Sequence, residues 1–313
     1  MQSYKHLPTL AQLRHLIALQ EHGHFGRAAD ACFITQSSLS TSIKELERTL
    51  GSQLVERTKR SVMMSALGTE VVERARRVVI DVEEICDTVN AANAPLDGIV
   101  RLGVIPSIAP FLLPRALPSL RKAYPGLKLY LREALSAKLI NLLANGSLDA
   151  LLIAFPYSIK NMESHIFAED PFWVAFPKGH PFADKPNITL HDLKNQDFML
   201  LEEGHCLRDH IVSATGGTLL EGDDNFHASS LHTLVQMVEN GLGVTLLPKM
   251  AIDTGLTRST GVQVKPLSDA KASRQIGMVW RKTSARKLEF MRLSEFFRDE
   301  LATPVRPRSK QKN

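Results

Sequence analysis

The feature that most restricts the fold is a pair of short amphipathic segments near the N-terminus. The segment 36–50 is predicted to be a helix, because apolar residues recur in it at spacings of 4, 3 and 4: Leu39, Ile43, Leu46 and Leu50. A shorter helix is predicted over 25–32, across the turn 33–35, and Gly51 ends the second helix. Two short helices across a tight turn, the second polar on its exposed first turns, form a helix-turn-helix pattern. An amphipathic helix from Leu10 to about Gly23 precedes the pair.

The polar groups at the start of the second helix suit contact with nucleic acid. Hydroxyl and amide groups of Gln36, Ser37, Ser38 and Ser40 can reach base edges or phosphates in a major groove. The stretch 54–64 predicts two short strands around a basic turn, a wing whose alternative is an ordinary solvated loop. The chain has a net charge of +5, and residues 1–67 hold eight Lys and Arg side chains against five Asp and Glu.

One long helix is predicted from Thr69 to about Ala94. Its apolar residues recur at heptad spacing with charged flanks: Val71, Ala75, Val78, Val82, Ile85 and Val89. A narrow apolar stripe between charged flanks favours pairing with a second copy of the chain. The alternative is a helix that faces the core of a single domain.

Strand and helix signals alternate after the linker 93–98, which predicts an α/β region with a mainly parallel sheet. At 313 residues the chain exceeds what one core usually supports. We therefore divide it into a DNA-binding domain (1–67), a linker and dimerisation helix (68–94), one lobe (95–168 with 273–301), a second lobe (169–272) and a basic tail without regular structure (302–313). In open α/β sheets ligands bind at the carboxyl ends of strands, where Ser107, Ser136, the loop 202–208 and Ser229 lie. Serines at helix starts are also common helix caps, and that alternative stays open.

Several function classes are disfavoured by what the sequence lacks. No apolar run approaches the roughly 20 residues of a membrane-spanning helix, and the N-terminus does not resemble a signal peptide, so we expect a cytoplasmic protein without membrane contact. The three cysteines, Cys32, Cys86 and Cys206, are too few and too widely spaced for a disulfide framework or a zinc cluster. We expect no metal, no cofactor and no enzymatic activity.

The N-terminal motifs resemble the signature of the LysR-type transcriptional regulators. The residues that carry the resemblance are His24-Phe25-Gly26-Arg27-Ala28-Ala29, Gln36-Ser37-Ser38-Leu39-Ser40, Ile43-Lys44-Glu45-Leu46-Glu47, Leu50-Gly51, Leu54-Val55-Glu56-Arg57 and Leu67-Gly68. Ser37 departs from the family, which commonly has proline there. The resemblance implies a winged helix-turn-helix, a linker helix and a two-lobed α/β effector domain similar to periplasmic binding proteins. It also implies binding to double-stranded promoter DNA, a homodimer that pairs into a homotetramer, and contact with RNA polymerase. The expected DNA contacts are Arg27, Gln36, Ser37, Ser38, Ser40, Arg57 and Arg60.

The stretch Gly204-His205-Cys206-Leu207-Arg208-Asp209 resembles the peroxide-sensing loop of the OxyR-like members of that family. The resemblance implies that Cys206 reacts with hydrogen peroxide in a pocket formed by Ser107, Ser136, His205, Arg208, Asp209 and Ser229. Physically, His205, Arg208 and a helix start favour the thiolate, whereas Asp209 opposes it. One departure matters, because OxyR has a second cysteine nine residues further on, where this chain has Thr215.

Two hypotheses about the stimulus to which the regulator responds stay open. The first is a redox regulator that senses peroxide through Cys206. The second is a regulator driven by a small anionic metabolite in the cleft between the lobes. An enzyme, such as a thiol peroxidase, or a solute-binding protein would leave the DNA-binding pattern unexplained.

Overall fold

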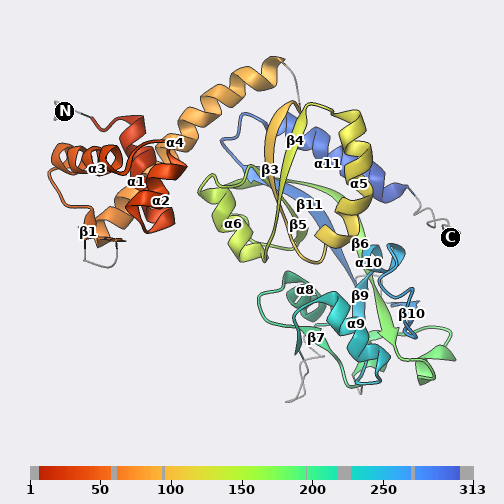
Figure 1. Ribbon diagram of the computed structural model, residues 1–313. Coiled ribbons are helices and arrows are strands. Elements are labelled where there is room, and N and C mark those ends of the chain that lie inside the picture. The colour runs from red at the N-terminus through yellow and green to blue at the C-terminus, as the bar shows by residue number, and fades with distance from the viewer. Residues whose placement is uncertain are drawn as a thin grey trace, which may run out of the picture. The chain divides into compact units, whose positions relative to one another are not determined.

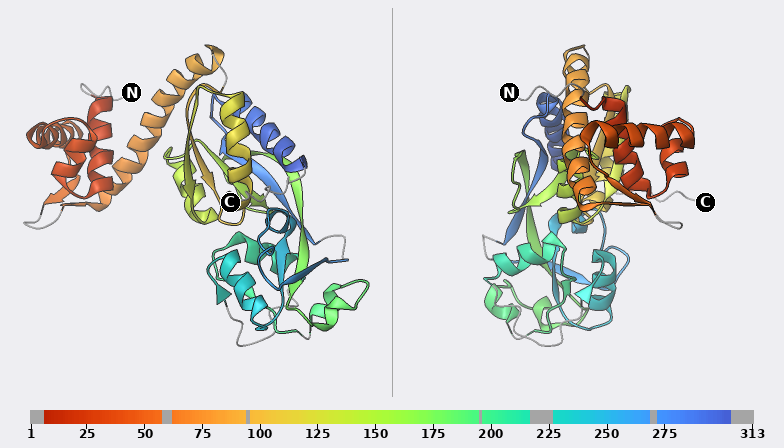
Figure 2. Two further views of the ribbon diagram at one scale, coloured as in Figure 1. Left: turned by 45° about the vertical axis from the view of Figure 1, so that its right-hand side comes forward. Right: turned by 90° about the vertical axis from the view of Figure 1, so that its left-hand side faces the viewer.

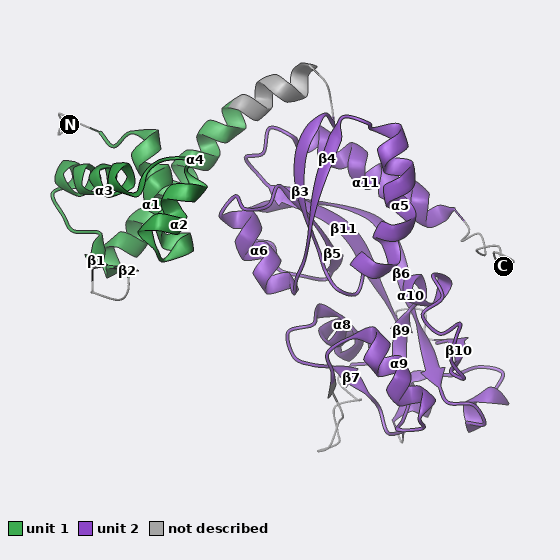
Figure 3. Cartoon of the chain, in the orientation of Figure 1, with its two compact units in different colours: residues 1–90 green, residues 91–313 purple. Residues whose placement is uncertain are grey.

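The computed structural model describes residues 7–57, 62–93, 96–194, 196–216, 227–268 and 272–303. The chain divides into an N-terminal unit, residues 1–90, and a C-terminal unit, residues 91–313 (Figures 1 and 3). The predicted wing turn with Arg60 and the tail from residue 304 lie outside the described residues.

The N-terminal unit is built as the helix-turn-helix pattern predicts. Its elements are α1 (Leu10–His22), α2 (Phe25–Ala31), α3 (Gln36–Leu50), β1 (Val55–Arg57), β2 (Val62–Met64) and most of α4 (Ala66–Asn93). Thr35 caps α3 by accepting the Ser38 N–H, and Gly51, at φ 66°, ends it in the left-handed conformation that glycine adopts at low cost. The apolar face of α3 is buried, as expected, and the two predicted wing strands pair antiparallel.

Helix α4 has two different halves. Near its start Val72 and Ala75 are buried, and Val72 joins the core of the N-terminal unit. Further along, Val78, Val82 and Ile85 are 45%, 36% and 66% exposed. The predicted long helix is therefore confirmed, and part of its apolar stripe is uncovered in the single chain.

The C-terminal unit contains a seven-stranded sheet with strand order β10-β6-β11-β5-β3-β4, in which β9 also pairs with β6. The strands of the C-terminal unit are β3 (Gly98–Val104), β4 (Leu127–Glu133), β5 (Ala150–Phe155), β6 (Met162–Phe176), β7 (Leu200–Leu201), β8 (His227–Ala228), β9 (Thr245–Pro248), β10 (Gln263–Pro266) and β11 (Ser273–Arg281). Strands β7 and β8 pair in parallel in a separate two-stranded sheet. The C-terminal unit also contains helices. Its helices are α5 (Ala109–Ala123), α6 (Ser136–Ala144), the short helix Pro181–Ala183, α7 (Leu190–Leu193), α8 (Cys206–Ala214), α9 (Leu231–Glu239), α10 (Lys249–Asp253) and α11 (Lys287–Ala302). Helices α5 and α11 lie side by side over the sheet (Figure 2).

The expectation of a mainly parallel sheet is wrong. Only β3 pairs in parallel in this sheet, with β4 and β5, whereas β6, β9, β10 and β11 pair antiparallel. The physical reason is that β11 brings the chain back from the second lobe and runs antiparallel to both β5 and β6. The first part of β6 pairs with β11, and its end pairs with β9 and β10, so one 15-residue strand belongs to both lobes.

Candidate redox site and nucleic-acid interface

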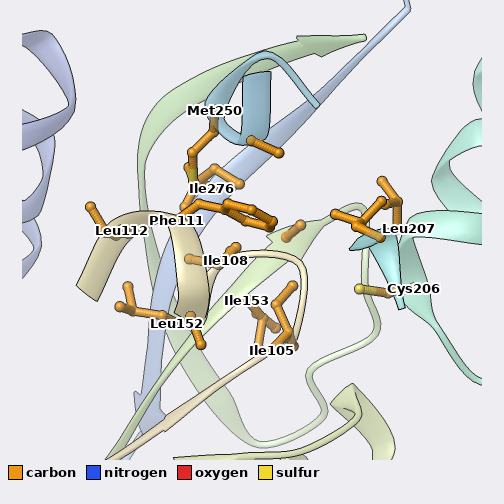
Figure 4. Close-up of a cluster of buried hydrophobic side chains, with 14 of the residues drawn as sticks. Ile105, Ile108, Phe111, Leu112, Leu152, Ile153, Cys206, Leu207, Met250 and Ile276 are labelled. Carbon is orange, nitrogen blue, oxygen red and sulfur yellow. The ribbon is translucent and has the colours of Figure 1, made fainter. Parts of the chain in front are cut away.

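Cys206 is the first residue of α8 and is buried, with 6% of its surface exposed. Cys206 and Leu207 belong to the apolar core of the C-terminal unit, and Figure 4 shows them facing its cluster of aliphatic side chains. The thiol therefore meets small molecules only through an internal space or after local opening.

A small cavity of about 10 Å³ lies against Cys206. Its lining comes from three separate segments of the chain: Ile105, Pro106, Ser107, Leu135, Ser136, His205, Cys206 and Leu207. A volume of about 10–15 Å³ is the least that holds one water molecule, so the cavity admits a molecule of that size class. The structure thus brings Ser107, Ser136 and His205 together around Cys206, as the sequence predicted. Arg208, Asp209 and Ser229 do not line this space.

Ser107 is held by a buried arginine that the sequence did not indicate. Arg274, on β11, donates to the Ser107 hydroxyl at 2.6 Å and to the Ser107 carbonyl at 2.9 Å. Because a guanidinium has no acceptor, the Ser107 hydroxyl accepts this bond and its own proton remains available for donation. We call these two bonds from Arg274 to Ser107 the Arg274 clamp. The clamp leaves the proton of the Ser107 hydroxyl to be donated beside the cavity.

The charge of Arg274 is balanced by Asp170, its cross-strand partner on β6. The Nε and Nη2 groups of Arg274 both donate to one oxygen of Asp170, at 3.1 and 2.9 Å. The side chains of Arg274 and Asp170 are 0% and 4% exposed. The other carboxylate oxygen accepts the Met250 N–H at the start of α10 at 2.9 Å. A buried ion pair with these added bonds therefore joins Ser107 to the strands shared by the two lobes.

Ser136, at the start of α6, is 2% exposed, and its hydroxyl makes no hydrogen bond of good geometry within the described residues. It faces the thiol closely enough to lower the pKa of Cys206. A buried hydroxyl without a firm partner is uncommon and leaves a donor beside the cavity for an incoming molecule.

Burial is the largest influence on Cys206 and raises the pKa of its thiol. Ser136, the Arg274 cation and the Leu207 N–H oppose this rise, and Asp209 adds to it. The expectation that nearby charges set a thiolate environment needs correction in two respects. The helpful cation is Arg274 rather than Arg208, and desolvation outweighs it.

His205 and Arg208 have other roles in this structure. Burial lowers the pKa of His205, so its ring is neutral near pH 7 and offers no positive charge. Arg208 approaches Glu203 at 3.7 Å, in a pair whose carboxylate is exposed. Ser229 is exposed, and the neighbouring Ser230 caps α9 by accepting the Thr233 N–H.

Two further polar residues near Cys206 escaped the sequence analysis. His210, one turn further along α8, is 4% exposed and lies at 3.0 Å, through Nε2, from the Pro156 carbonyl. Burial raises the pKa of Tyr157, and the proximity of Cys206 and Asp209 raises it further.

Thr215, at the end of α8, is 4% exposed, and its hydroxyl donates to the Ile211 carbonyl.

The predicted DNA-contacting side chains occupy the first turn of α3 and its surroundings. Arg27, Gln36, Ser37 and Ser38 are exposed. The Thr35 hydroxyl lies 2.9 Å from that of Ser37 and 2.8 Å from that of Ser38, so the first turn presents a small group of linked hydroxyls. Ser40 is half-buried, and the side chain of Arg57 is not among those described.

Neither a metal cluster nor a membrane-spanning segment is found in the described part of the chain. No three His, Cys, Asp or Glu side chains are grouped to hold a metal ion there. No described helix is both long and apolar enough to cross a membrane.

A helix-turn-helix with a paired-strand wing, a long helix and a two-lobed α/β unit define a transcription regulator with a separate effector domain. Residues 10–78 match the bacterial regulatory helix-turn-helix of the lysR family, and residues 93–302 match the LysR substrate binding domain. The chain therefore belongs to the LysR family of transcriptional regulators.

Its relatives include two curated regulators. The chain is 38% identical over 288 residues to the HTH-type transcriptional regulator EstR of Acinetobacter baylyi, covering 91% of this chain and 94% of the relative. It is 35% identical over 292 residues to the DNA-binding transcriptional dual regulator OxyR of Escherichia coli, covering 92% and 94%.

Solved OxyR structures share the fold. A full-length cysteine-to-aspartate variant from Pseudomonas aeruginosa superposes with a TM-score of 0.78 at 30% identity, covering 98% of this chain and all of that one. A cysteine-to-serine variant from Corynebacterium glutamicum, with H2O2 bound, gives a TM-score of 0.63 at 34% identity and covers 95% and 94%.

Proposed function

We propose that this LysR-type regulator responds to hydrogen peroxide through Cys206. The observation that carries the proposal is the cavity of about 10 Å³ whose lining includes Cys206, Ser107 and Ser136. Such a space is at the lower limit for one water molecule, so peroxide, with its two oxygen atoms, enters after a small displacement of the lining, and a typical metabolite is excluded while the site keeps this shape.

The reaction needs only groups that surround the cavity. The Cys206 thiolate attacks one peroxide oxygen, the S–O bond forms as the O–O bond breaks, and the second oxygen leaves as water after taking a proton. Sulfur is oxidised by two electrons to a sulfenic acid, and the peroxide is reduced. The hydroxyls of Ser107 and Ser136 can donate to the peroxide oxygens, while Arg274 favours the thiolate.

The relatives support the proposal. A Corynebacterium glutamicum relative has been solved with H2O2 bound, and a Dickeya chrysanthemi relative, 34% identical over 295 residues, is called a hydrogen peroxide-inducible genes activator. This chain has no cysteine after Cys206, so its oxidised state is a sulfenic acid, a mixed disulfide with a small thiol, or a bond between subunits.

The test combines mass spectrometry with DNA footprinting on the purified full-length protein. Mild peroxide should add one oxygen or a small-thiol adduct at Cys206 and change the footprint on a target promoter. Cys206→Ser should abolish both effects, whereas Cys32→Ser, the matched control, should retain them. An unmodified Cys206 in a protein whose footprint does not respond to peroxide would overturn the proposal.

A second candidate is control by a small anionic metabolite bound between the lobes. It is favoured by the relative EstR, whose name does not refer to peroxide, and by Thr215 in place of a second cysteine. Ser107, Ser136 and helix N–H groups would bind the anion. A footprint that changes with an added carboxylate ligand in Cys206→Ser protein would select this candidate.

The remaining assignments belong to the same proposal. Promoter DNA contacts the first turn of α3 and the wing, and the exposed stripe of Val78, Val82 and Ile85 pairs two copies of α4. Two such dimers form a tetramer in the cytoplasm, where the protein contacts RNA polymerase. The divisions at residues 67/68, 94/95, 168/169 and 272/273 remain our domain boundaries, and no enzymatic turnover is part of the proposal.

A further inference from the structure

His210 is a buried histidine whose two ring nitrogens have different surroundings. Its Nε2 lies 3.0 Å from the Pro156 carbonyl oxygen. A carbonyl can only accept, so Nε2 carries the proton and donates. Its Nδ1 is buried and has no hydrogen-bond partner among the described residues.

The ring is in its neutral form near pH 7. Burial is the largest effect that lowers the pKa of His210, the Arg274 cation lowers it further, and the Pro156 carbonyl and Asp209 partly oppose this. With the single proton on Nε2, Nδ1 bears an unshared lone pair. A buried acceptor left without a partner lowers the stability of the folded protein, so it calls for a functional reason.

The helix places His210 one turn from the reactive cysteine. Cys206 and His210 are four residues apart on α8, and both are on its buried face. Side chains at such spacing are neighbours, with Cβ atoms about 5–6 Å apart. Side chains in a helix generally lean toward the N-terminus of that helix, which for His210 is the direction of the turn that begins with Cys206. Tyr157, which follows the carbonyl that holds the ring, is itself close enough to Cys206 to sense its charge.

We infer that His210 Nδ1 accepts the hydrogen bond of the Cys206 sulfenic acid and so retains the one-oxygen oxidised state. The inference rests on the proposed function. Oxidation adds to the sulfur an O–H donor that the thiol lacks, and the buried lone pair has no other described partner. The oxidised form would thereby gain a bond that the reduced form does not have. The chain has no cysteine after position 206 that could form a disulfide with Cys206. The hydrogen bond to His210 would instead stabilise the oxidised state.

Two substitutions at position 210 distinguish the role of Nε2 from that of Nδ1. In His210→Gln the side-chain amide can still donate to the Pro156 carbonyl, but no acceptor stands at the Nδ1 position. In His210→Asn the amide oxygen can replace Nδ1, and the bond to Pro156 is lost. The full-length proteins are oxidised with equimolar hydrogen peroxide, and a 1,3-dione that traps sulfenic acid is added after increasing delays. The trapped fraction, measured by mass spectrometry, gives the lifetime of the sulfenic acid.

We expect His210→Gln to shorten the lifetime about fivefold, the change that corresponds to losing one hydrogen bond of about 1 kcal/mol, and His210→Asn to stay near wild type. Equal lifetimes for His210→Gln and wild type would overturn the inference, and so would equal shortening in both variants. If wild-type Cys206 forms no sulfenic acid, the proposed function itself fails. If it forms one that does not depend on His210, only this inference fails.

A second measurement needs no substitution in the helix. In wild-type protein labelled with 15N-histidine, the unprotonated Nδ1 of His210 gives a distinct signal, which should move when the lone pair accepts the sulfenic O–H. The signal should return after reduction by added thiol. A His210 Nδ1 signal that stays in place while mass spectrometry shows oxidised Cys206 would contradict the inference.

Discussion

Replacing Arg274 by methionine tests the clamp that joins Ser107 to the strands shared by the lobes. The substitution leaves the Asp170 carboxylate 4% exposed, with the Met250 N–H as its remaining bond and no counter-charge from Arg274. Removing one partner of a buried pair costs about 3–5 kcal/mol, because the other charge stays buried and uncompensated. For a domain of about 150–250 residues this corresponds to a fall of roughly 10 °C in Tm.

Tryptophan fluorescence is a suitable assay, because both tryptophans, Trp173 on β6 and Trp280 on β11, lie in the C-terminal unit. The double variant Arg274→Met with Asp170→Asn should be more stable than Arg274→Met alone. The asparagine keeps an acceptor for the Met250 N–H and removes the buried charge. Arg274→Lys should fall between wild type and Arg274→Met, because it keeps the charge but not the forked geometry. A Tm within 2 °C of wild type for Arg274→Met, or a double variant less stable than the single, would refute this reasoning.

Four further outcomes are expected. Thr215→Cys should form a disulfide with Cys206 after peroxide treatment. Because the two positions lie at opposite ends of α8, the disulfide should be accompanied by a loss of helical circular dichroism. A disulfide formed with the helical signal unchanged would contradict this. Alkylation of Cys206 should keep accelerating above about pH 9.5, where an ordinary thiol of pKa about 8.5 has largely ionised, because burial raises the pKa of Cys206; a plateau near that pH would refute the assignment. Val82→Asp should give monomers in sedimentation, and an unchanged oligomer would show that the exposed stripe on α4 does not pair. Gln36→Ala should reduce discrimination between target and random DNA, whereas Arg57→Ala should weaken binding to both; equal losses for Gln36→Ala on both DNAs would argue against α3 as the recognition helix.

The local architecture could be predicted from the sequence because its signals are local. Thr9 and Thr35 cap helices, Gly23 and Gly51 end them, and the spacing of Leu39 and its neighbours determines the buried face of α3. Local signals of this kind do not indicate the first ten residues of β6, 162–171. In that stretch charged and apolar side chains mix, because parts of the strand are exposed while its pairing partner, β11, lies more than 100 residues further along the chain.

Some residues of the candidate site could be predicted from local sequence motifs, and others could not. Cys206, Ser107, Ser136 and His205 could be anticipated from motifs at strand ends and helix starts. Arg274 and Asp170 could not, because each is an isolated charged residue within a strand and only the register of β6 with β11 brings them together. His210 directly follows the recognised segment 204–209, but its importance depends on the Pro156 carbonyl, which comes after a different strand.

The length of α8 has a consequence for the timing of any signal that starts at Cys206. Positions 206 and 215 are nine steps apart along α8, a rise of about 13.5 Å, whereas a disulfide needs Cα atoms about 4.4–6.8 Å apart. An OxyR-like protein with a second cysteine there must unwind the helix to oxidise fully, and the closed bond then records a past exposure until it is reduced. This chain has threonine at that place, so the proposed oxidation of Cys206 does not require α8 to unfold. On that proposal the oxidised fraction would follow the balance between peroxide and cellular thiols, with a delay set by the lifetime of the sulfenic acid.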